Sequence, residues 1–160
     1  MYKLRHINIL LVLKFLSISL MVISAIMIVP AIVSFLNSDG ELLGFFISII
    51  SVFLVGVFSF AFNPASIRQA ITLRDSFLII LVMWIGVPFA GMLPFYLASP
   101  IDSFSDALFE SFSGFTTTGF SHLFAYEEYN QSIIVWKSII QWLGGMGLLI
   151  FVIALFPFIK

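Results

Sequence analysis

The sequence predicts an all-α integral membrane protein, with four transmembrane helices and one re-entrant pore helix and filter loop between the third and the fourth. The chain of 160 residues is 61% hydrophobic and only 9% charged, and its mean hydropathy is +1.18, which is beyond the range of soluble domains. Its apolar stretches reach the ~20 residues that cross the hydrocarbon core as a helix. A short amphipathic segment and an oxygen-rich, glycine-containing loop separate the last two stretches.

Each of the four apolar stretches is predicted to span the membrane, because in lipid a helix satisfies its own backbone. The first stretch follows basic residues, as a signal peptide does. It is too long for a usual signal core, however, and it has no clear small-residue cleavage site before Pro30. We therefore expect a retained helix. The stretches are approximately Ile7–Phe35, Leu42–Phe62, Phe77–Ala98 and Ile133–Phe158.

The positions of the charges predict the orientation. By the positive-inside rule, the N-terminus, the loop between the second and third spans and the C-terminus face the cytoplasm. Seven of the eight acidic residues fall in the other two loops. This asymmetry either reflects ordinary topology or forms a negative outer mouth that concentrates cations. The cytoplasmic bases are Lys3, Arg5, Lys14, Arg68, Arg74 and Lys160, and the outer acids are Asp39, Glu41, Asp102, Asp106, Glu110, Glu127 and Glu128.

The connections and the third span carry local breaking signals. Asn63 can cap a short helix that has Pro64 in its first turn. In the third span, Pro88 and Pro94 each remove a hydrogen bond and kink the helix. A bent helix could lean around a pore, or the prolines could be ordinary transmembrane irregularity.

Residues 103–115 are predicted to form a short amphipathic helix. Ser103 or Ser105 can cap its start, and Gly114 lets the chain leave it. At 1.5 Å per residue its length is ~18 Å, too short to span. A helix of this kind persists at membrane depth only where protein surrounds it. The apolar residues that recur at three- and four-residue spacing are Phe104, Leu108, Phe112 and Phe115.

The loop after this helix is the candidate ion filter. Thr116, Thr117 and Thr118 are β-branched and favour extended backbone, so that successive carbonyls can line one side of a narrow passage. Gly119 can take φ values forbidden to the others and turn a carbonyl inward. Rings of carbonyls can replace the hydration shell of a potassium ion. The alternative is a polar extracellular loop that merely contains three threonines.

Three further features remain open from the residues alone. Glu110 either braces the filter from behind through hydrogen bonds or is a solvated acid in the outer vestibule. Trp136 and Lys137 fit an interfacial anchor at the start of the fourth span. The glycines from Gly144 to Gly147 permit close helix packing or flexing.

The sequence gives no support to an enzyme. A membrane enzyme needs ionisable groups inside its spans, and beyond Lys14 the predicted spans hold almost none. His6 and His122 lie on opposite predicted sides, and the chain has no cysteine. We therefore expect no enzymatic activity and no cofactor, and a net charge of −1 suggests no nucleic-acid partner.

Several segments resemble the Trk/Ktr/HKT potassium transporter superfamily, and are most like the N-terminal part of a bacterial Trk-type potassium uptake membrane subunit. The resemblance covers Leu73 to Pro157 well, and the first two spans fit the extra N-terminal helix pair of Trk-type members. The segments that carry it are Asp106–Gly119, Trp136–Gly147, Leu73–Phe77, and Trp84 leading to Leu93–Phe95.

The resemblance implies a fold of four helix–pore-loop–helix repeats around a central pore. Residues 1–72 would be the N-terminal helix pair with its cytoplasmic connection, and residues 73–160 the first repeat. The filter would comprise Thr116, Thr117, Thr118, Gly119 and Phe120, with potassium bound through the carbonyls of Thr117, Thr118 and Gly119. Glu110 and Gly114 would support it.

The resemblance also implies a function and partners. The chain would carry potassium across the cell inner (cytoplasmic) membrane as an N-terminal fragment that contributes one of four filter strands, because one strand cannot surround an ion. We expect a partial sequence rather than a homotetramer of single repeats. The implied partners are the remaining repeats, membrane lipid, a cytoplasmic nucleotide-binding regulatory subunit and a second copy in a homodimer. The alternative function is a non-conducting accessory or assembly subunit.

Overall fold

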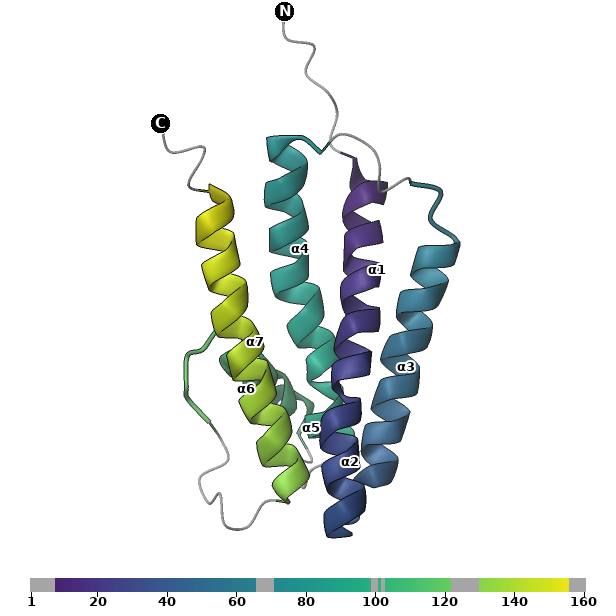
Figure 1. Ribbon diagram of the computed structural model, residues 1–160, viewed down its shortest axis with the longest axis vertical. Helices are drawn as coiled ribbons and strands as arrows, with labels where there is room; N and C mark the ends of the chain where they lie inside the picture. The colour runs from purple at the N-terminus through teal and green to yellow at the C-terminus, as the bar shows by residue number, and fades with distance from the viewer. Residues whose placement is uncertain (1–7, 66–70, 99–100, 102, 122–129, 156–160) are drawn as a thin grey trace, which may run out of the picture.

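The computed structural model describes residues 8–65, 71–98, 101, 103–121 and 130–155. Within these residues the chain forms helices and no strand (Figure 1). The helices are α1 (Ile9–Ile26), α2 (Ile28–Asn37), α3 (Leu42–Ala61), α4 (Leu73–Gly91), α5 (Leu93–Leu97), α6 (Phe104–Phe115) and α7 (Gln131–Leu155).

Four helical stretches are long and apolar enough to cross a membrane, which confirms the predicted number of spans. The helices α1 and α2 together make the first, and α4 and α5 the third. The stretches are Ile9–Asn37, Leu42–Ala61, Arg74–Leu97 and Gln131–Leu149. The predicted end of the fourth stretch, at Phe158, lies outside the described residues.

A buried lysine joins the first two spans at one end of the bundle. The Lys14 ammonium donates hydrogen bonds to the carbonyl oxygens of Phe60, at 3.0 Å, and Asn63, at 2.9 Å. These carbonyls lie at the C-terminal end of α3, where a cation complements the helix dipole. Asn63 does not begin a helix: residues 63–65 are irregular, and its side chain accepts a hydrogen bond from the Ala65 amide at 2.9 Å. The predicted continuation into residues 66–70 lies outside the described chain.

The helix α4 begins with a capping box. Thr72 occupies the cap, its hydroxyl accepts from the Asp75 amide, and the Asp75 carboxylate accepts from the Thr72 amide at 3.0 Å. The same carboxylate accepts from the Asn8 amide at 2.9 Å, which ties the start of α1 to α4. The helix contains Pro88, which leaves the carbonyl one turn earlier without its helical donor, and it ends at Gly91. The next helix, α5, has Pro94 in its first turn, where a missing donor is tolerated.

The C-terminal end of α5 and the N-terminal end of α7 lie beside the turn between α2 and α3. The Asn130 side chain, just before α7, donates to the carbonyl of Asp39 at 3.2 Å and to the carboxylate of Glu41 at 2.6 Å. A Cβ placed on Gly44 of α3 would lie 2.2 Å from the carbonyl oxygen of Leu97, so α5 ends at the same place. The chain between α5 and α7 therefore leaves and rejoins one end of the bundle, and α6 lies within that excursion (Figure 1).

Candidate functional site

The helix α6 packs against α7 with almost no space between their backbones. A Cβ on Gly144 would lie 2.0 Å from the carbonyl oxygen of Phe115, the last residue of α6. Gly144 lies about 20 Å along the helix axis from Gln131, the first residue of α7. The C-terminal end of α6 therefore lies deep in the bundle, near half the thickness of a bilayer.

Gly114 has a different role from the predicted one. The helix does not end there but continues to Phe115. A Cβ on Gly114 would lie 2.4 Å from the Cδ1 atom of Ile140 in α7. Gly114 therefore provides the close approach of α6 to α7 rather than the exit from the helix.

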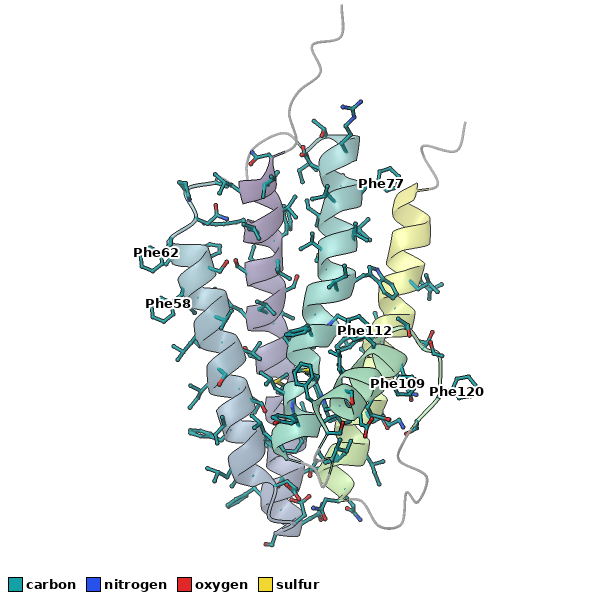
Figure 2. All side chains as sticks on the ribbon, turned by 180° about the vertical axis from the view of Figure 1, so that it is seen from behind. Phe58, Phe62, Phe77, Phe109, Phe112 and Phe120 are labelled. Atoms are coloured by element: carbon teal, nitrogen blue, oxygen red, sulfur yellow. The ribbon has the colours of Figure 1, made fainter. Side chains whose placement is uncertain are left out.

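Of the predicted apolar residues of α6, Phe115 is buried, Leu108 and Phe112 are partly buried and Phe104 is exposed, whereas the other buried residues are small or polar. Phe104 is 48% exposed and Phe109 43%, whereas Ala107, Glu110 and Ser111 are fully buried. The Phe109 side chain lies toward the surface (Figure 2), where lipid would surround it, and the small side chains allow close helix contacts. Ser103 occupies the predicted cap position, but its hydroxyl makes no capping bond and pairs instead with that of Ser105 at 2.7 Å.

Hydrogen bonds from two side chains connect α6, α7 and the end of α4. The Ser111 hydroxyl donates to the carbonyl of Pro88 at 2.7 Å. The Trp136 indole donates to the carbonyl of Gly91 at 3.0 Å, and Trp136 is fully buried. The prediction that Trp136 and Lys137 form an interfacial anchor is therefore wrong, since both side chains lie inside the described structure.

The end of α6 is closed by two backbone hydrogen bonds in the Schellman pattern. The Thr117 amide donates to the carbonyl of Gly114, and the Thr118 amide to the carbonyl of Ser113, both at 3.0 Å. This pattern places Thr117 in the left-handed region, with φ at 55°. The extended backbone expected for the threonines is therefore not adopted at Thr117, because the helix end determines its conformation. A β-branched residue held there stores ~1–3 kcal/mol of strain.

Three successive carbonyl oxygens follow this helix end without a hydrogen-bond donor. Among the described residues, nothing donates to the carbonyls of Thr117, Thr118 or Gly119. On either side the carbonyls are bonded: the Thr117 hydroxyl donates to that of Thr116 at 2.7 Å, and the Ser113 hydroxyl donates to that of Phe120.

The predicted filter residues are brought together on the surface of the described chain. Thr116 to Phe120 are exposed, and the Phe120 ring points away from the helices (Figure 2). Gly119 has φ at 81°, and a Cβ placed on it would meet nothing within 4 Å. The conformational freedom predicted for Gly119 is therefore used, and space for a side chain is not what restricts this position.

Behind this segment lies a buried ion pair that the sequence did not predict as a pair. Glu110 of α6 contacts Lys137 of α7, with 0% and 5% of their side chains exposed. The Ser121 hydroxyl donates to the Glu110 carboxylate at 2.8 Å, and the Lys137 ammonium donates to the Ser121 oxygen. The alternative of Glu110 as a solvated acid is thus excluded. The available signal was a lysine in the first turns of an apolar span, where an ionisable residue points to function by default.

No metal centre is found in the part of the chain that the structure describes, where no group of three or more His, Cys, Asp or Glu side chains gathers. The described residues do not include His6 or His122, which were predicted to lie on opposite sides of the membrane. They also do not include the predicted outer acids Asp102, Glu127 and Glu128.

Comparisons with known proteins point to one family. A family model described as TrkH, a cation transport protein, matches residues 44–160. The Trk system potassium uptake protein TrkH of Vibrio parahaemolyticus is 32% identical over 147 residues, which cover 91% of this chain and 30% of that protein. The Trk system potassium uptake protein TrkI of Halomonas elongata is 31% identical over 152 residues, covering 93% of this chain and 30% of its own length.

A solved structure agrees with these relatives. The crystal structure of the potassium transporter TrkH from Vibrio parahaemolyticus superposes with a TM-score of 0.86 at 30% sequence identity, covering 94% of this chain and 32% of that one. The chain therefore spans about a third of the length of the proteins it matches.

Proposed function

Because this chain belongs to the TrkH family of cation transport proteins, we propose that it supplies one filter strand of a potassium-conducting pore. The chain is a multi-pass membrane protein with four apolar spans. The pore would lie in the cytoplasmic membrane with the N-terminus of the chain on the cytoplasmic side. Potassium would be its transported substrate, and no cofactor or covalent chemistry takes part.

The observation that carries this proposal is the row of three carbonyl oxygens at Thr117, Thr118 and Gly119, which receive no hydrogen bond from the described residues. Unbonded carbonyls are costly in a low-dielectric environment unless something else coordinates them. A dehydrated potassium ion would supply that coordination, and it would regain oxygen ligands in return. Thr116 and Phe120 would complete the filter segment at its two ends.

The location of α6 supports the same function. Its chain segment starts and returns at one end of the bundle, so α6 would be a re-entrant pore helix. Its C-terminal end carries about half a negative elementary charge from the helix dipole, and the filter segment begins there. Glu110 and Gly114 would support the filter by fixing α6 against α7.

One strand presents oxygens to an ion from one side only, so a complete filter needs three more strands. We propose that residues 73–160 form one helix–pore-loop–helix repeat, that residues 1–72 form an N-terminal helix pair, and that the other strands come from further repeats. Membrane lipid, a cytoplasmic nucleotide-binding regulatory subunit and a second copy of the protein are the proposed partners.

Ion uptake tests the proposal. The protein would be expressed from its own gene in bacteria that lack potassium uptake, and rubidium uptake would be measured in the presence of competing potassium or sodium. We expect uptake that potassium inhibits and equimolar sodium does not. Normal membrane abundance without rubidium uptake would contradict the proposal and favour a non-conducting accessory subunit.

A further inference from the structure

We propose that Lys137 is a positioning residue for the filter strand. With Glu110 it forms a buried ion pair that holds Ser121, the residue that follows the filter segment. This inference rests on the proposed function, and it assigns a selectivity-determining role to a side chain outside the strand itself.

The geometry joins three separate segments. Glu110 lies on α6, Lys137 on α7 and Ser121 at the end of the exposed filter segment. The Ser121 hydroxyl is both a donor and an acceptor: it donates to the Glu110 carboxylate at 2.8 Å and accepts from the Lys137 ammonium. Ser121 is therefore held by a closed triangle that also contains the ion pair.

This triangle fixes one end of the strand, and the end of α6 fixes the other. At the helix end, the amides of Thr117 and Thr118 are bonded to carbonyls of α6. Beyond Gly119, the carbonyl of Phe120 accepts from the Ser113 hydroxyl, and Ser121 is bonded to the ion pair. The three carbonyls without donors lie between the two anchors, so their spacing depends on both.

The charge of Lys137 gives the pair a second effect. The positive charge of an ammonium close behind a cation path would repel potassium. The adjacent negative charge of the Glu110 carboxylate offsets this repulsion. Removing the carboxylate alone would leave a buried positive charge, whereas removing the ammonium alone would leave a negative one. The two single substitutions should therefore have unequal effects on conduction, although they break the same contact.

Lys14 offers a matched control. It is also buried, at 8% exposure against 4% for Lys137. It binds the carbonyls of Phe60 and Asn63 rather than a carboxylate, and the start of α1, where it lies, is at the other end of the bundle from the start of α7 (Figure 1). A substitution there removes a buried lysine without touching the filter segment.

The experiment compares Lys137→Gln, Glu110→Gln, the double variant of both and Lys14→Gln, each expressed from the native gene. Membrane abundance, rubidium uptake per molecule and the potassium-over-sodium preference would be measured. We expect Glu110→Gln to lower uptake at least about tenfold and Lys137→Gln to lower the preference several-fold while retaining more uptake. The double variant should recover part of the uptake lost in Glu110→Gln, and Lys14→Gln should lower abundance without changing the preference.

Ser121→Ala keeps the inference testable if the charge variants fail to reach the membrane, because it removes the tether and leaves both charges in place. We expect normal abundance and a several-fold loss of preference. Unchanged preference in Ser121→Ala or Lys137→Gln at normal abundance would overturn the inference while the wild-type protein stays selective. A wild-type protein without potassium preference would instead overturn the proposed function.

Discussion

The turn after α2 and the segment after α6 share one backbone design but differ in what their oxygens bind. Each helix is followed by a non-glycine residue in the left-handed region, Ser38 with φ at 53° and Thr117 with φ at 55°. Two residues later each has a glycine with positive φ, 86° at Gly40 and 81° at Gly119. The amides of Asp39 and Thr118 donate back to serine carbonyls five residues earlier.

In the α2–α3 turn, the residue after the left-handed position is hydrogen-bonded through both its side chain and its carbonyl. The Asp39 carboxylate accepts from the Ser34 hydroxyl and from the Glu41 amide, and the Asp39 carbonyl accepts from Asn130. In the filter segment, by contrast, the carbonyls from Thr117 to Gly119 receive nothing from the described residues. A similar helix ending is thus hydrogen-bonded to the rest of the protein at Asp39, whereas after α6 it presents three successive carbonyl oxygens without a donor.

This difference teaches that backbone conformation alone does not identify a filter. The side chain after the left-handed residue also differs: the Asp39 carboxylate accepts from the Glu41 amide, whereas the Thr118 hydroxyl pairs with that of Thr116. Substitutions at equivalent positions of the two segments therefore separate function from conformation.

The largest effect is expected at Gly144, since the filter segment begins where α6 lies directly against the backbone of α7. Gly144→Ala places a Cβ 2.0 Å from the Phe115 carbonyl, which should lower the free energy of unfolding by ~3 kcal/mol and abolish rubidium uptake. Gly147→Ala is the control, because its Cβ would meet nothing within 4 Å. Similar thermal unfolding of the two variants in detergent would contradict the packing described at this site.

Gly119→Ser and Gly40→Ser compare the two glycines directly. Both positions have positive φ and open space, so each substitution should cost ~1–2 kcal/mol of conformational energy. Only Gly119→Ser should change ion preference, lowering potassium-over-sodium uptake about tenfold because it shifts a filter carbonyl. An unchanged ratio in Gly119→Ser, or an equal change in Gly40→Ser, would count against the filter assignment.

Thr117→Gly and Ser38→Gly relieve strain at the two helix ends. Each should change the free energy of unfolding by no more than ~1 kcal/mol, because relief of the left-handed conformation opposes the entropy that glycine gains on unfolding. Thr117→Gly should also weaken potassium preference, since it loosens the strand and removes the hydroxyl that bonds the Thr116 carbonyl. Ser38→Gly should leave ion preference unchanged in the same uptake assay.

The smallest effect is expected from protonation of Asp39 in the α2–α3 turn, which should lower the stability of the protein in acid. Burial tends to raise the pKa of Asp39, but the side chains of Ser132 and Ser34 and the amides of Glu41 and Ser132 outweigh it, so the pKa lies below the usual 3.8. A lowered folded pKa gives stability that is present above the unfolded pKa and is lost as the pH falls through the folded value.

Thermal unfolding should therefore become easier between about pH 5 and about pH 3, and the change should be smaller in Asp39→Asn. If thermal unfolding of the two proteins had the same pH dependence, the hydrogen bonds of the α2–α3 turn would not depend on the Asp39 charge.

The sequence predicted the parts of the fold that depend on local pattern. Four apolar runs predicted the spans, and the spacing of Phe104, Leu108 and Phe112 predicted the short helix. The spacing did not predict which of these residues are buried: Phe115 is in the core, whereas Phe104 is exposed, because aromatic residues of a membrane protein can face lipid while small residues pack inside.

The arrangement around the filter segment needed three-dimensional information. The ion pair of Glu110 and Lys137 joins residues far apart in the chain, and no local spacing indicates it. The left-handed conformation of Thr117 follows from the hydrogen bonds that close α6, which overrule the preference of a β-branched residue for extended backbone.

Locating bound rubidium would show whether the carbonyls of Thr117, Thr118 and Gly119 coordinate the transported ion. Crystals of the protein expressed from its own gene would be grown in rubidium chloride, and anomalous diffraction would place the ions. We predict rubidium peaks within coordination distance of the carbonyl oxygens of Thr117, Thr118 and Gly119, with no peak at the carbonyl of Asp39 in the α2–α3 turn. Rubidium bound elsewhere along the membrane axis, with those three oxygens bonded to protein or water instead, would show that these carbonyls do not form the filter.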